Sequence, residues 1–95
     1  MNQNLLLVVK HTSQVGDDLL IFPGLSSGKY ELNNDVEKIK IVTPDNIILE
    51  KDAEFSIPFD VPSREYWVLL PNTQKDEVPI GSQIWIYKSL SEITK

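Results

Sequence analysis

Glu65-Tyr66-Trp67-Val68-Leu69-Leu70-Pro71 and, further along, Val78-Pro79-Ile80-Gly81-Ser82-Gln83-Ile84-Trp85-Ile86-Tyr87 are the two stretches that decide the fold of this chain. Both are rich in aromatic and β-branched residues, and Pro, Gly, Asn or Ser bounds each apolar run. Neither run is long enough for a typical helix. With the polar residues 72–77 between them, they predict a strand, a loop, a turn and a second strand.

The first third of the chain shows similar short apolar runs between turn residues. We expect strands over residues 5–10 and 19–22, with residues 11–18 forming the loop between them. Pro23 and Gly24 are expected to end the second strand, and residues 29–32 can form a further short one.

The middle of the chain alternates more clearly. Residues 36–42 place isoleucines on one face and lysines on the other, which is the period of a half-buried strand. Pro44-Asp45-Asn46 predicts a turn, and residues 47–49 a strand after it. A further inward series comprises Ala53, Phe55, Ile57 and Phe59.

The predicted fold class is therefore all-β. At 95 residues the chain is expected to form a single domain over residues 1–95, with a short tail at about 89–95. We predict a small closed Greek-key barrel of six or seven short antiparallel strands. A β-sandwich of two sheets has the same sequence pattern and stays open as the alternative.

Composition narrows the classes of function. A formal net charge of −5 repels a phosphate backbone, so general nucleic-acid binding is not expected. The sequence has no cysteine, which rules out disulfides and thiolate metal sites and fits a reducing cytoplasm. The apolar run near the start follows no basic segment and is too short to span a membrane, so neither a signal peptide nor a membrane contact is expected.

Two segments carry a resemblance to a known family. They are Val15-Gly16-Asp17-Asp18-Leu19-Leu20-Ile21-Phe22-Pro23-Gly24-Leu25, with Gly28 beyond it, and Gln74-Lys75-Asp76-Glu77-Val78-Pro79-Ile80-Gly81-Ser82-Gln83-Ile84-Trp85-Ile86. In order, they resemble the opening and closing parts of the second domain of elongation factor Tu. The resemblance implies a closed Greek-key barrel that serves as a contact module.

The chain also departs from that family. Full-length members carry a Gly-rich phosphate loop followed by Lys and Ser or Thr, and this sequence has no such pattern, so GTP chemistry is not implied. Asp17 and Asp18 stand where the family commonly has a basic residue. This difference argues against contact with the aminoacyl end of transfer RNA.

The polar clusters are weak candidates for chemistry. His11, the only histidine, could be drawn with Ser13 and Asp17 or Asp18 as a hydrolytic triad, but a solvated loop histidine is the preferred interpretation. Asp17-Asp18 and Asn33-Asn34-Asp35 could bind a cation such as calcium, yet turn and capping roles suit them better. No cofactor, metal site or catalytic residue is predicted.

Four aromatic residues are the best candidates for contact with a partner: Tyr66, Trp67, Trp85 and Tyr87. Neighbouring residues on a strand point to opposite faces, so one member of each pair is expected inside and the other outside. The pattern alone does not decide which member of each pair faces outward. We expect at least one tryptophan in the core, and take Tyr66 and Tyr87 as the candidate surface aromatics that bind the partner. Packing between strands within the domain is the alternative role for them.

These observations together favour a small cytoplasmic module without catalysis, which contacts a macromolecular partner, expected to be a protein, through a face or edge of the sheet. The alternative is a minimal enzyme or small-ligand carrier that uses the mouth of the barrel. A deep pocket with convergent polar groups would favour the alternative, and a flat aromatic patch the binding module. The sequence leaves the oligomeric state open.

Overall fold

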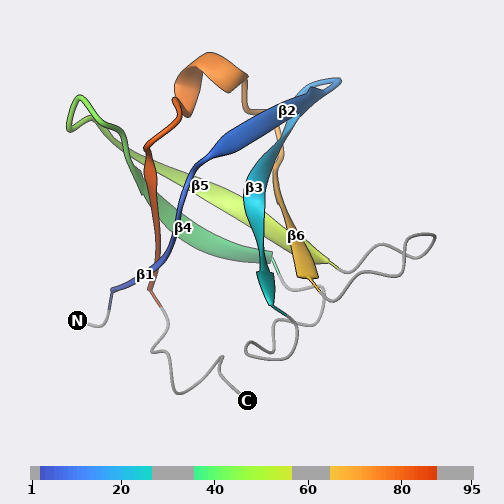
Figure 1. Cartoon of the computed structure of the whole chain (residues 1–95), viewed down its shortest axis with the longest axis horizontal. Helices are drawn as coiled ribbons and strands as arrows, with labels where there is room; N and C mark the ends of the chain where they lie inside the picture. Colours follow the sequence, from blue (N-terminus) through green and yellow to red (C-terminus); the bar gives the residue numbers. More distant parts are fainter. Residues whose placement is uncertain (1–2, 27–35, 57–64, 88–95) are drawn as a thin grey trace.

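The computed structural model describes residues 3–26, 36–56 and 65–87, which form seven β-strands and one short 3₁₀ turn. In chain order these elements are β1 (Asn4–Val8), β2 (His11–Val15), β3 (Asp18–Ser26), β4 (Val36–Val42), β5 (Ile48–Ser56), β6 (Glu65–Leu70), η1 (Lys75–Glu77) and β7 (Gln83–Ile86). The predicted all-β class is confirmed (Figure 1). Within the described ranges, no helix has the length and apolar character needed to cross a membrane.

All seven strands belong to one antiparallel sheet, in the order β1-β7-β4-β5-β6-β3-β2. The sheet curls around a common centre and has the shape of a half-barrel (Figure 1). Within it, β4, β5 and β6 are neighbours in sequence order and β7 returns to lie beside β4. This order of four strands is a Greek key.

The two edge strands of the sheet, β1 and β2, are consecutive in the chain. The two residues between them, Val9 and Lys10, hydrogen-bond to different parts of the sheet. The amide of Val9 donates to the carbonyl of Ser82 at 2.8 Å, just before β7, and the amide of Lys10 donates to the carbonyl of Phe22 in β3 at 2.9 Å. The chain therefore passes directly from one edge of the curled sheet to the other.

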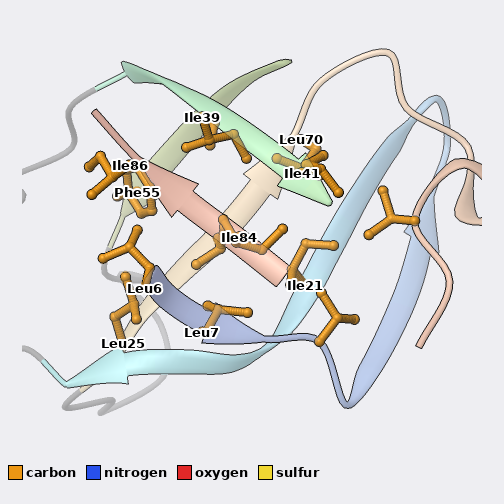
Figure 2. Close-up of a cluster of buried hydrophobic side chains, with 14 of the residues drawn as sticks. Leu6, Leu7, Ile21, Leu25, Ile39, Ile41, Phe55, Leu70, Ile84 and Ile86 are labelled. Carbon is orange, nitrogen blue, oxygen red and sulfur yellow. The ribbon is translucent and has the colours of Figure 1, made fainter. Parts of the chain in front are cut away.

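The hydrophobic core fills the concave side of the sheet. In β4, Ile39 and Ile41 are fully buried while Lys38 is exposed, so the predicted alternation is confirmed. Figure 2 shows these isoleucines, Ile84 and Ile86 of β7 and Phe55 of β5 gathered in one cluster. Burial of such side chains is the main stabilising term of a small domain, because each contributes about 1.5–3 kcal/mol.

The prediction of a loop over residues 11–18 is wrong, because β2 occupies most of it. Thr12, Ser13 and Gln14 pair with β3 in a hairpin that turns at Gly16, whose φ of 62° suits glycine. The mostly polar sequence hid this strand, because β2 is an edge strand that leaves its side chains only partly buried. An edge strand of this kind needs no apolar face.

The predicted end of a strand at Pro23 and Gly24 is also wrong, since β3 continues to Ser26. The pairing of β3 with β6 shifts register between Ile21 and Leu25, and the peptide bond before Pro23 is cis. A Cβ on Gly24 would lie 2.7 Å from the carbonyl oxygen of Tyr66. The two residues therefore form an irregularity inside the strand, where bulges commonly accept them.

The turn predicted at Pro44-Asp45-Asn46 is confirmed. The amide of Asn46 donates to the carbonyl of Thr43 at 2.9 Å, and Asn46 has a φ of 65°. The strand after the turn is one continuous β5, rather than two separate runs, and it buries Ala53 and Phe55 as expected. The predictions for residues 29–32, 33–35, 57–59 and 89–95 lie outside the described residues.

Candidate binding surface

The two neighbouring aromatics of β6 point to opposite faces, with Tyr66 inside and Trp67 outside. Tyr66 is buried, with 2% of its surface exposed, whereas Trp67 is 36% exposed on the outer face. The cause is the pairing with β3, which places Tyr66 opposite Leu25 and Val68 opposite Ile21 on the inner face. The prediction of Tyr66 as a surface aromatic is therefore wrong, and Trp67 takes the outward position.

The aromatics of β7 and the residue after it occupy the outer face as well. Ile84 and Ile86 are fully buried, so Trp85 between them points outward and is half-buried. The ammonium group of Lys40 lies 5.4 Å from the centre of a Trp85 ring. Since Trp67 is also outside, the prediction of a tryptophan in the core is wrong; among the described aromatics, Phe55 and Tyr66 are buried there.

Tyr87 is half-buried on this outer face rather than freely exposed. Its hydroxyl donates to Oε2 of Glu50 at 3.0 Å. Partial desolvation, and then the hydrogen bond with the Glu50 carboxylate, raise the pKa of the Tyr87 phenol above 10.0. Tyr87 thus lies within a network on its own sheet, and Trp67 is the more accessible aromatic.

Trp67 stands in a shallow groove of about 230 Å³ on the outer face of the sheet. We call this feature the Trp67 groove, and its lining comes from β2, β3, β5 and β6: Val15, Asp18, Leu20, Ser56, Trp67 and Leu69. The pairing of strands brings Leu20 opposite Leu69, and Trp67 opposite Ser56. Side chains from distant parts of the sequence therefore form one apolar surface around the indole.

Sequence reasoning missed Val15, Leu20 and Leu69 as members of this surface. A usable signal was present in the runs Leu19-Leu20-Ile21 and Trp67-Val68-Leu69-Leu70, which are apolar without alternation. A strand with one solvent-facing side normally alternates, so a continuous run implies apolar side chains on both faces. Here the inner half of each run enters the core, and the outer half lines the groove.

Two carboxylates lie at the Trp67 groove. Asp18 is part of the lining, and Glu54 lies opposite Leu69 in the neighbouring strand. Oδ1 of Asp18 accepts a hydrogen bond from the amide of Asn72 at 3.2 Å. Among the described residues that line the groove or pair directly with its lining, none is Lys or Arg.

Two other hollows lie beside η1. One, of about 250 Å³, includes Asp45 and Glu77 in its lining; the other, of about 370 Å³, includes His11 and Lys75. Glu77 is already engaged, because its Oε2 accepts from the amide of Gln74 at 2.7 Å and its Oε1 pairs with the Lys51 ammonium at 2.9 Å. The backbone hydrogen bond first, and Lys51 second, lower the pKa of Glu77 below 4.5.

His11 lies at the opposite end of the β2–β3 hairpin from Asp17 and Asp18, the acids of the triad considered from sequence. Its ring packs against Phe22, with centroids 5.6 Å apart, at the start of β2. Asp17 lies beyond the far end of the same strand, in the turn before β3. A hydrolytic triad needs all three groups within hydrogen-bonding reach, so the arrangement lacks the geometry for it.

The described residues also contain no group of three or more His, Asp or Glu side chains that could hold a metal ion. The Asn33-Asn34-Asp35 cluster lies outside these residues. The Trp67 groove combines an apolar lining with the carboxylate of Asp18. No protein-family model, curated protein or solved structure matches the chain.

Proposed function

We propose that this protein is a small non-catalytic module that binds a partner protein through the outer face of its sheet, with the Trp67 groove as the contact. The observation that carries the proposal is an exposed tryptophan among aliphatic side chains of neighbouring strands. Tryptophan is enriched at energetically important positions of protein interfaces, because it buries a large area with few rotatable bonds. Contiguous apolar patches on a soluble surface commonly mark such contacts.

The rival function would place a small ligand or a reaction at the mouth of the curled sheet. The hollows beside η1 are about as open to solvent as the Trp67 groove, and Glu77 within one of them is held by Gln74 and Lys51. Core side chains fill the concave side of the sheet (Figure 2). Ligand sites are usually concave and carry a few convergent polar groups, so these hollows support the rival less well than the groove supports binding.

The proposal also includes a closed barrel, a protein as the partner and a cytoplasmic location. Two hydrogen bonds support a closed Greek-key barrel, as in the second domain of elongation factor Tu. Val9 bonds to Ser82 beside β7, near one end of the strand order, and Lys10 bonds to Phe22 in β3, near the other end. The net charge of −5 supports a protein rather than a nucleic acid as the partner. The lack of cysteine supports a cytoplasmic location.

Capture from the native lysate on immobilised protein tests the proposal. We compare the wild type with Trp67→Ala and with Ile80→Ala, which removes an exposed apolar side chain from a hollow beside η1. The wild type and Ile80→Ala should retain the same partner, and folded Trp67→Ala should lose it. Retention by Trp67→Ala would refute the proposed contact, and loss by Ile80→Ala alone would favour the mouth of the sheet.

A further inference from the structure

We infer that the Trp67 groove accepts a basic peptide segment, in which an apolar side chain enters the groove and an adjacent Lys or Arg meets its carboxylates. This inference rests on the proposed function and names the chemistry of the partner. Its basis is the combination of an apolar floor with two carboxylates, those of Asp18 and Glu54, and no Lys or Arg among the described lining residues and their strand partners.

The size of the groove limits what can enter it. At about 230 Å³ it is smaller than the roughly 300–1,000 Å³ that is usual for sites of drug-sized ligands and cofactors. Leu20 and Leu69 lie opposite one another beside Trp67 and offer contact to carbon atoms. One or two apolar side chains of a peptide fit this space, whereas a bulky cofactor does not.

Among the described residues, the carboxylates at the groove differ from those acidic residues of the outer face that are paired with lysines. On the same outer face of the sheet, β4 and β5 pair Lys38 with Asp52 and Lys40 with Glu50. Around the groove, Asp18 and Glu54 have no such basic counterpart among its described lining residues and their strand partners. A partner that brings a cation restores the charge balance found on the neighbouring strands.

The same charges exclude two other occupants. A second copy that docked through the same patch would bring Asp18 and Glu54 against their own equivalents, and like charges at an interface are repulsive. A neutral apolar segment would cover these carboxylates and leave them without compensation for the lost water. A segment with both an apolar and a cationic side chain avoids both costs.

Selection of peptides from a random library displayed on phage, with the wild-type protein as bait, tests the inference. Enriched peptides should share an apolar residue next to Lys or Arg. Their synthetic forms should change the fluorescence of Trp67 in the Trp85→Phe variant, where it is the remaining tryptophan. Trp67→Ala should weaken binding about 30-fold or more, as expected for a central interface aromatic.

Charge variants then separate the cation from the apolar contact. Asp18→Asn and Glu54→Gln should each weaken binding about 2- to 5-fold, because exposed ion pairs contribute modestly. Asp45→Asn makes the same change of charge in the turn between β4 and β5, and should leave affinity unchanged. Affinity should also fall as salt rises from about 0.05 to about 0.5 M.

The outcomes distinguish this inference from the proposed function. Peptides that need Trp67 but show no preference for Lys or Arg would overturn the inference and leave the binding module standing. Equal effects of Asp18→Asn and Asp45→Asn, or affinity independent of salt, would also overturn it. If no enriched peptide depends on Trp67, the groove is not a peptide site and both proposals fail.

Discussion

Substitution of the two adjacent aromatics of β6 should separate the core of this protein from its binding surface. Tyr66 is 2% exposed, and Trp67 is 36% exposed. Burial of an aromatic side chain removes about 150–250 Å² from water, which at about 25 cal/mol per Å² corresponds to roughly 4–6 kcal/mol as an upper estimate. Measured losses for large aromatics cut to alanine in cores are about 3–5 kcal/mol.

We therefore expect Tyr66→Ala to reduce the free energy of unfolding by about 4 kcal/mol. A domain of 95 residues has roughly 5–14 kcal/mol in total, so this variant should be marginal or unfolded. Its melting temperature should fall by about 15–30 °C. Trp67→Ala removes contacts on the outer face and should cost about 1 kcal/mol.

Urea unfolding, followed by circular dichroism, measures both effects. Tyr66→Phe is the matched control, because it keeps the ring in the core and should lose about 1.5 kcal/mol or less. Equal destabilisation by Tyr66→Ala and Trp67→Ala would refute the assigned faces of β6. A larger loss in Trp67→Ala would show that the pairing of β6 with β3 is shifted by one residue.

Three further predictions concern charge and backbone geometry. Glu77→Gln should destabilise the protein by about 0.5–1 kcal/mol at neutral pH. Because the folded-state pKa of Glu77 lies below 4.5, its contribution is complete above that value and is lost as pH falls through the folded pKa, so wild-type and variant unfolding curves should converge in acid. An ultraviolet titration should place the phenol pKa of Tyr87 above 10.0. Glu50→Gln should lower this pKa only in part, because desolvation is the larger cause of the shift. An unchanged pKa in Glu50→Gln would contradict the hydrogen bond between Tyr87 and Glu50. Gly24→Ala should cost about 1–3 kcal/mol, because its Cβ would lie 2.7 Å from a carbonyl oxygen. Gly16→Ala meets no atom within 4 Å and should lose only the roughly 1–2 kcal/mol of its left-handed φ. Thermal unfolding measures both losses, and a Gly24→Ala variant as stable as the wild type would refute the close approach.

The sequence was most informative where apolar and polar residues alternate. Ile39 and Ile41 among lysines identified β4 and its inner face, and Pro44 to Asn46 identified the turn that follows. These signals are local, because side-chain direction and turn dihedrals depend on neighbouring residues. The class of the fold and most of its strands could be predicted for that reason.

The errors arose where distant pairing decides the outcome. The strand β2 has little apolar character and forms because it pairs with β3. The strand β3 continues past Pro23 and Gly24 because it pairs with β6 on both sides of these residues. Whether Tyr66 or Trp67 enters the core depends on the register between β3 and β6, which two adjacent aromatics do not encode by themselves. The groove was missed for the same reason, because Leu20 and Leu69 become neighbours only in the sheet.

The position of β7 between β1 and β4 has a consequence for the synthesis of the protein on the ribosome. Among the described strands, the first pairs with the last, as Asn4 with Ile86, and β7 is the only neighbour of β1. Residues near the start must therefore wait, without their partner, until almost the whole described chain has emerged. Such non-local pairing slows folding, and a nascent chain with unpaired apolar strands is exposed to aggregation. A chaperone that protects the first strand during translation should therefore raise the yield of folded protein.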